Sequence, residues 1–90
     1  MIELQKYAID GFTSMLYDLF DEIVTDAFVT DFLQNDKEIS KLTKALEYDD
    51  FVTVFAIFTT FFYVDCDFSV FEENYDQIKQ TTEELLRRCI

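Results

Sequence analysis

The chain contains no proline and a single glycine, Gly11, and this strongly restricts the folds open to it. Tight β-turns usually depend on glycine or proline, so a chain without them favours helices joined by short polar loops. Half of the 90 residues are hydrophobic and 18% are aromatic, which is enough apolar material for a folded core. The sequence therefore predicts an all-α fold, a compact antiparallel bundle of four to five helices, with residues 1–90 forming one acidic domain.

Residues 12–33 show the strongest helical periodicity. Apolar side chains from Phe12 to Phe28 recur every three or four positions, and acidic side chains fall between them. This spacing predicts one helix over 12–33. The apolar residues of segment 2–8 predict either a short leading helix or the first turns of a longer helix that runs through Gly11.

Capping patterns mark the next two helices. Asn35 followed by Glu38 fits a capping box, with asparagine in the usual place of serine or threonine, and predicts a helix over 37–47. Asp50 is placed to cap the apolar run 51–64. That run is rich in β-branched and aromatic residues, yet its apolar positions also fit helical spacing, so we favour a buried helix over a strand.

A last helix is predicted to begin near Ser69. The segment Ser69-Val70-Phe71-Glu72 has the form of a full capping box, and apolar positions continue at helical spacing to Cys89.

The charge is strongly negative and unevenly distributed. Nineteen acidic against seven basic residues give a net charge of −12. Residues 1–36 carry eight of the acids and one lysine, and residues 49–78 carry seven acids and no base. Such a field repels nucleic acid and anionic lipid and attracts basic protein surfaces. We therefore expect a basic protein partner, a nucleic-acid-binding protein or a nuclease, and no direct binding to nucleic acid or membrane.

Asp18, Glu22 and Asp26 follow one another at four-residue intervals in the predicted 12–33 helix, with Asp21 beside them. Each such like-charge pair destabilises a helix by a few tenths of a kcal/mol. Four residues of helix rise about 6 Å, close to the phosphate spacing along a nucleic-acid strand. A row of carboxylates of this kind could occupy a basic nucleic-acid channel. The alternative, that acidity only keeps a phenylalanine-rich protein in solution, stays open.

The predicted partner-binding surface combines carboxylates with tyrosines as anchors. Its members are Asp18, Asp21, Glu22, Asp26, Asp49, Asp50, Glu72, Glu73, Asp76, Tyr17 and Tyr48.

A rival interpretation is an assembly module. If the 51–64 element is apolar on every side, a small bundle would leave part of it uncovered. Val52, Ile57, Phe61 and Tyr63 are then candidates for self-association, and the protein could be a monomer or a homodimer.

Catalysis and metal binding find little support. Without histidine the chain lacks the most common general base and zinc ligand, and it has no glycine-rich phosphate loop. Asp65-x-Asp67-x-Ser69 resembles the first half of an EF-hand loop. However, Val70 stands where the loop needs glycine and Asp76 where it needs glutamate. We expect no enzyme activity, no metal site and no cofactor.

The cysteines and the N-terminal segment favour a cytoplasmic protein. Cys66 and Cys89 form no metal-binding pattern, and we expect reduced thiols rather than a disulfide. The carboxylates of Asp65 and Asp67 should raise the pKa of Cys66. No basic segment precedes an apolar stretch at the N-terminus, so we expect no signal peptide.

The expected function follows from composition alone, because no residue pattern points to a family. Small acidic helical chains occur among phage-encoded inhibitors of host defence, toxin immunity proteins and nucleic-acid mimics. We expect a stoichiometric inhibitor of this type, acting in the host cytoplasm if it is phage-encoded.

Overall fold

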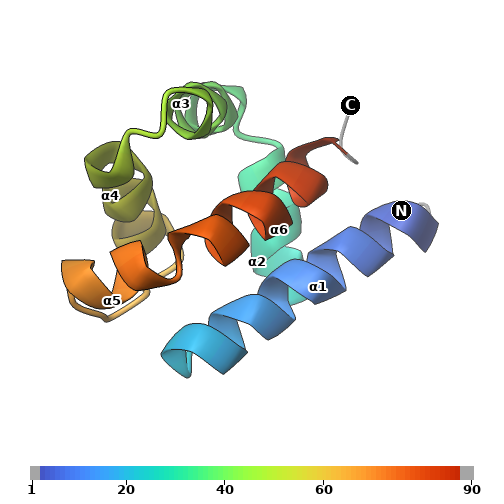
Figure 1. Ribbon diagram of the computed structural model, residues 1–90. Helices are drawn as coiled ribbons and strands as arrows, with labels where there is room; N and C mark the ends of the chain where they lie inside the picture. The colour runs from blue at the N-terminus through green and yellow to red at the C-terminus, as the bar shows by residue number, and fades with distance from the viewer. Residues whose placement is uncertain (1–2, 88–90) are drawn as a thin grey trace.

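The computed structural model describes residues 3–87, which form six α-helices and no strand (Figure 1). The helices are α1 (Glu3–Phe20), α2 (Asp26–Leu33), α3 (Asp36–Glu47), α4 (Phe51–Phe61), α5 (Phe68–Glu73) and α6 (Tyr75–Arg87). The all-α prediction is confirmed, and the ambiguous 51–64 element is a helix that ends at Phe61.

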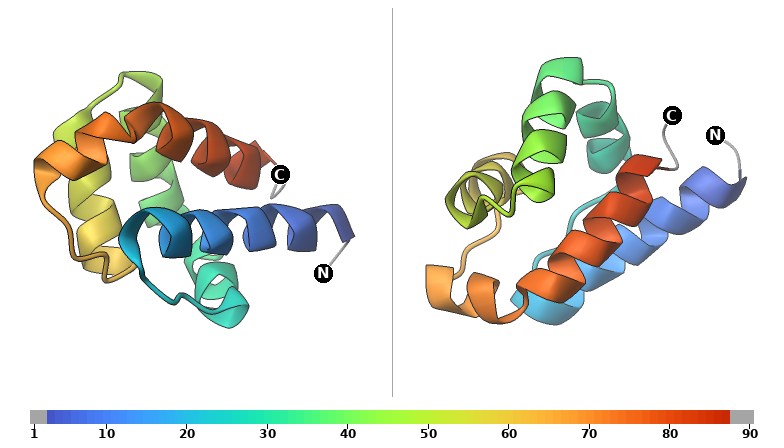
Figure 2. Two further views of the ribbon diagram at one scale, coloured as in Figure 1. Left: turned by 60° about the horizontal axis from the view of Figure 1, so that its bottom comes forward. Right: turned by 45° about the horizontal axis from the view of Figure 1, so that its top comes forward.

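Two helices from opposite ends of the chain form the long side of the molecule. α1 and α6 lie side by side and run in opposite directions, which brings the start of α1 and the end of α6 to the same side (Figures 1 and 2). α3 and α4 run across this pair rather than along it (Figure 2). The fold is therefore a helical bundle in which only part of the packing is antiparallel.

The core is a network of phenylalanine rings. Phe12 of α1 lies 5.1 Å from Phe62, measured between ring centroids, and Phe62 lies 4.8 Å from Phe32 of α2. Phe58 of α4 lies 5.6 Å from Phe71 of α5. All five side chains are essentially buried, and each removes roughly 150–250 Å² from water. This network joins α1, α2, α4 and α5, and buried aliphatic residues of α3 and α6 extend it.

The two predicted caps in the middle of the chain are confirmed. The side-chain oxygen of Asn35 accepts a hydrogen bond from the backbone N–H of Glu38 at 3.1 Å, and α3 begins there. Asp50 accepts from the N–H of Thr53 at 3.2 Å and from the Thr53 hydroxyl at 2.6 Å, at the start of α4.

The single helix predicted over 12–33 is wrong. α1 runs through Gly11, as one alternative predicted, but it ends at Phe20 because Asp21 adopts a left-handed backbone conformation with φ 58°. A non-helical segment follows. α2 then starts at Asp26, where the hydroxyl of Thr25 accepts a hydrogen bond from the N–H of Phe28 at 3.1 Å.

The single helix predicted from Ser69 to Cys89 is also wrong. α5 begins one residue earlier, with Asp67 at the N-cap position, so Ser69 lies inside the helix. The helix stops at Asn74, whose side-chain amide donates a hydrogen bond to the carbonyl oxygen of Val70 at 2.9 Å, and α6 starts anew. These two breaks raise the helix count above the predicted four to five, and Cys89 lies outside the described residues.

Candidate functional site

The predicted row of carboxylates on one helix does not exist. Asp18 lies on α1, Glu22 lies in the connection between α1 and α2, and Asp26 opens α2. Asp26 instead approaches the N-terminal half of α1, where its carboxylate lies 3.9 Å from the Lys6 ammonium nitrogen. Asp26 therefore does not extend a line from Asp18 and Glu22, and a regular 6 Å spacing is absent.

A different acidic cluster forms where two connections meet. The segment between α1 and α2 packs against the segment between α4 and α5, and the Glu22 carboxylate accepts a hydrogen bond from the backbone N–H of Asp65 at 3.3 Å. Cys66 lies in the segment between α4 and α5, next to Asp65. Burial raises the pKa of its thiol, and the negative charges of Asp67, Asp65 and Glu22 raise it further. The predicted direction for Cys66 is thus confirmed.

We call this cluster the acidic end. Its members are Asp18, Asp21, Glu22, Asp65 and Asp67. None of their carboxylates takes part in an ion pair within residues 3–87. No cation among the described residues offsets their mutual repulsion, and a basic partner would relieve it.

Three exposed apolar side chains stand among these carboxylates. Ile23 is 84% exposed, Tyr63 71% and Tyr17 54%. Ile23 and Glu22 border two surface hollows, one of about 330 Å³ shared with Tyr17 and Asp18, and one of about 150 Å³ shared with Tyr63. Ile23 thus lies between the two tyrosines, and the acidic end carries a central aliphatic side chain with an aromatic ring on each side.

Two of the three non-glycine residues with positive φ among the described residues lie at the same place, and the third, Asp49, follows α3. Asp21 ends α1 with φ 58°, and Tyr63 follows α4 with φ 57°. Such conformations cost a non-glycine residue roughly 1–2 kcal/mol and are least suited to a bulky aromatic one. Glycine would remove this cost at Tyr63. Strained residues of this kind cluster at binding and switch sites.

Three other acids of the predicted surface are Asp49, Asp50 and Asp76. All three are exposed, and the first two make contacts with other residues of the chain. The Asp49 carboxylate lies 2.6 Å from the Lys79 ammonium nitrogen, and this hydrogen bond raises the pKa of Lys79. Asp50 caps α4, and its hydrogen bonds with Thr53 lower the pKa of Asp50. Asp76 lies exposed in the first turn of α6. Asp49 is thus paired with a lysine and Asp76 helps to raise the pKa of that lysine, whereas no carboxylate of the acidic end is paired with a cation within residues 3–87.

The remaining predicted partner residues lie on other parts of the surface. Glu72 and Glu73 are exposed on the short helix α5. Tyr48 is 72% exposed and borders a shallow hollow with Lys41, Lys44 and Asp50, so both charge signs lie beside it and it does not belong to the acidic end.

The four self-association candidates do not form one exposed surface. Ile57 is only 8% exposed, and Phe61 is half-buried with its ring centroid 4.6 Å from that of Phe32. These two residues belong to the core, which corrects the prediction for them. Val52 and Tyr63 are exposed but lie at opposite ends of α4.

Sequence reasoning missed Ile23, Asp65 and Asp67 as members of this surface. It assigned Ile23 to the core because the helix was expected to continue, and it assessed the two aspartates as metal ligands and as neighbours of Cys66 but not as part of a binding surface. The run Ile23-Val24-Thr25 carried a usable signal, since β-branched residues disfavour helix and threonine favours an N-cap.

Neither a family model, nor a curated protein, nor a solved structure matches the chain. The functional argument therefore depends on the site alone.

The described residues also limit the chemistry. Within 3–87 no three acidic or cysteine side chains converge as metal ligands would, so the carboxylates of the acidic end form a spread surface. Among the six helices of this range, none has the length and apolar character needed to cross a membrane. A spread of carboxylates around exposed apolar side chains suits contact with a protein surface better than chemistry on a small substrate.

Proposed function

We propose that the protein is a non-catalytic, stoichiometric inhibitor that places its acidic end on the basic site of a nucleic-acid-binding protein or nuclease. The observation that carries this proposal is the position of Ile23, Tyr17 and Tyr63 among five carboxylates that form no ion pair with any described residue. A nucleic-acid mimic, an anti-defence protein and a toxin immunity protein would all work in this way.

Each component of the surface has a separate role in binding. The carboxylates and the net charge of −12 accelerate encounter with a basic surface and disfavour acidic partners. The aromatic and aliphatic side chains supply area that becomes buried on contact, and such anchors usually carry most of the binding free energy. Binding should therefore weaken with salt without disappearing.

Mimicry of nucleic acid by this protein would depend on a cluster of carboxylates rather than on a regularly spaced row along one helix. The acidic end joins side chains from two connections and the last turns of α1, so its charges come from three parts of the chain. Occupation of a nucleic-acid site needs negative charge at a few phosphate positions, because phosphate contacts set position and affinity.

The test compares two variants with the same change in charge. Asp18→Asn with Asp65→Asn alters the acidic end, and Asp31→Asn with Asp36→Asn alters exposed positions in the last turn of α2 and the first turn of α3. None of these four side chains makes a hydrogen bond or ion pair within 3–87, so both variants should fold.

Immobilised native protein and both variants are exposed to lysate at low salt and at about 0.15 M salt, with and without competitor DNA. We expect the native protein and the Asp31/Asp36 variant to retain the same basic nucleic-acid-binding protein. The Asp18/Asp65 variant and the competitor DNA should each reduce its recovery. Equal recovery by both variants would contradict a role for the acidic end.

A further inference from the structure

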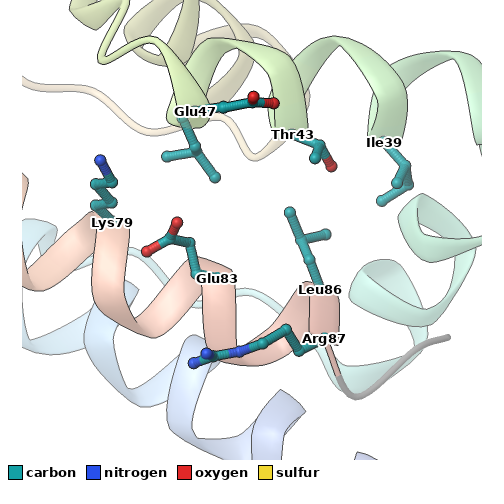
Figure 3. A pocket seen from close by; sticks show the side chains of 8 residues that line it. Ile39, Thr43, Glu47, Lys79, Glu83, Leu86 and Arg87 are labelled. Carbon is teal, nitrogen blue, oxygen red and sulfur yellow. The ribbon is translucent and has the colours of Figure 1, made fainter.

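A second surface lies away from the acidic end, in a groove between α3 and α6. Side chains of the two helices face each other across it (Figure 3). The groove has a volume of about 490 Å³, within the range of sites that bind ligands or peptide anchors. Leu46 lies at its base and is almost fully buried, while Ile39 and Leu86 are half-buried beside it.

The polar side chains that border the groove are not equivalent. Lys79 is paired with Asp49 at 2.6 Å, and Arg87 with Glu84 at 3.0 Å. Glu47 and Glu83 also line the groove, and neither forms an ion pair in the part of the chain that the structure describes. The charge of Glu83 also helps to raise the pKa of Lys79, so Glu83 is partly compensated. Glu47 has no such neighbour among the residues that line the groove, and the protein is acidic overall.

We propose that this groove binds a basic amphipathic helix of a partner protein. Leucine-like side chains at helix positions i, i+3 and i+4 would enter between Ile39 and Leu86, and lysine or arginine beside them would pair with Glu47 and Glu83. An apolar helix face in an apolar groove is a common mode of peptide recognition, and the charges of the groove select a basic peptide over an acidic one. Among the described residues that line the groove, Thr43 is the one uncharged polar side chain and it is exposed, so these residues offer little to orient a small polar ligand.

This inference goes beyond the proposed inhibitor function and does not depend on it. The groove uses α3 and α6, whereas the acidic end uses the α1–α2 and α4–α5 connections, and the two surfaces share no residue. One partner could contact both surfaces, or each could serve a different partner.

The probe is a fluorescently labelled, amidated peptide of about four helical turns, with leucines on one face and lysines elsewhere. Two control peptides accompany it, one with every lysine replaced by glutamate and one with the same composition in a scrambled order. Fluorescence anisotropy gives the affinity of each. We expect only the first to bind tightly, because the second is repelled and the third cannot place its leucines on one face.

Protein variants separate groove binding from general attraction to an acidic protein. Glu47→Gln with Glu83→Gln should lower the affinity for the peptide about tenfold. Glu72→Gln with Glu73→Gln makes the same change in charge on α5 and should lower the affinity less than about twofold. Thr43→Phe should fill the groove and weaken binding at unchanged charge, with Ser40→Phe, at an exposed position of α3, as its control. Asp18→Asn with Asp65→Asn should bind the peptide almost like the native protein.

Circular dichroism confirms that each variant is folded before its affinity is compared. Equal weakening by both glutamate pairs would overturn the proposal, because the peptide would then respond to net charge alone. Unchanged affinity in the Thr43→Phe protein would overturn it too. Loss of binding in the Asp18/Asp65 variant would assign the peptide to the acidic end instead of the groove.

Discussion

Replacement of Tyr75 by phenylalanine tests the electrostatics around α6 most sharply. Tyr75 is 4% exposed, its ring centroid lies 4.1 Å from that of Phe51, and its hydroxyl has no hydrogen-bond partner among the described residues. The nearby Asp49 carboxylate is held by Lys79. Burial raises the pKa of Tyr75 to about 12, and the negative charges of Asp49, Glu83 and Asp50, together with a weak interaction of the hydroxyl with the Asp49 carboxylate, contribute to this shift.

The expected effect has a definite sign at each pH. In the unfolded chain a tyrosine ionises near pH 10, whereas the folded protein keeps its proton to about pH 12. Between these values the unfolded state has lost a proton that the folded state retains, so the native protein loses stability as pH rises. Relative to Tyr75→Phe, the loss is about 1.4 kcal/mol per pH unit and on the order of 2–3 kcal/mol in total. At neutral pH the phenylalanine protein should equal the native one or exceed it by about 1 kcal/mol, because a buried hydroxyl without a partner is removed.

Urea unfolding followed by far-UV circular dichroism measures both proteins, at neutral pH and at several values between about pH 9 and 12. The difference between them cancels the titration of the other tyrosines and the lysines. If Tyr75→Phe costs more than about 1 kcal/mol at neutral pH, the hydroxyl is hydrogen-bonded and the reasoning fails. A difference that stays constant with pH would show that the Tyr75 pKa is not raised.

Four further substitutions test individual parts of the fold by urea unfolding. Gly11→Ala should stabilise by about 0.5–1 kcal/mol, because Gly11 is helical and exposed and an added Cβ meets nothing within 4 Å; any destabilisation would mean that α1 does not pass through Gly11. Asn35→Ala should lower the free energy of unfolding by about 1 kcal/mol, because a helix cap is lost. Ser69→Ala should change it little, because Ser69 caps no helix. A larger loss for Ser69→Ala than for Asn35→Ala would show that Ser69 does cap a helix, as the sequence predicted. Tyr63→Asn should stabilise by about 0.5–1 kcal/mol, since asparagine tolerates the left-handed conformation, and should weaken partner binding; a less stable variant would show that Tyr63 is not strained.

The fold class and the middle of the chain were predictable because their signals are local. Asn35 and Asp50 each precede an apolar periodic run and each accepts a hydrogen bond from the N–H three residues later, as a capping residue should. The composition of the apolar run after Asp50 is typical of a strand, but the spacing of its apolar residues predicted a helix, and a helix is what forms. In both cases the sequence pattern and the tertiary packing favour the same structure.

The helix ends were not predictable from the usual stop signals. α1, α3 and α4 are each followed by a left-handed residue that is not glycine, namely Asp21, Asp49 and Tyr63. Periodicity continued across Asp21, because Ile23, Val24 and Ala27 fit the helical spacing even though the chain turns there. Tertiary packing holds these conformations against their local cost, and a single sequence does not show that packing.

The same break explains why the acidic surface differs from its prediction. Spacing along one helix grouped Asp18, Glu22 and Asp26, whereas the fold sends Asp26 toward Lys6 and brings Asp65 to Glu22. A contact between residues 43 positions apart has no counterpart in local spacing. The net charge was enough to predict an acidic surface. Which residues form that surface depends on the turn at Asp21, which local spacing does not show.

The most direct test of the central claim is a displacement titration on the basic protein captured by the native chain. Labelled DNA is bound to that protein, and native protein or either charge-matched variant is added while anisotropy reports the DNA that remains bound. The account predicts complete displacement at one equivalent of native protein and of the Asp31/Asp36 variant. The Asp18/Asp65 variant should need about tenfold more. DNA that stays bound while the native protein binds would contradict occupation of a nucleic-acid site, and equal displacement by both variants would contradict the acidic end as the surface responsible.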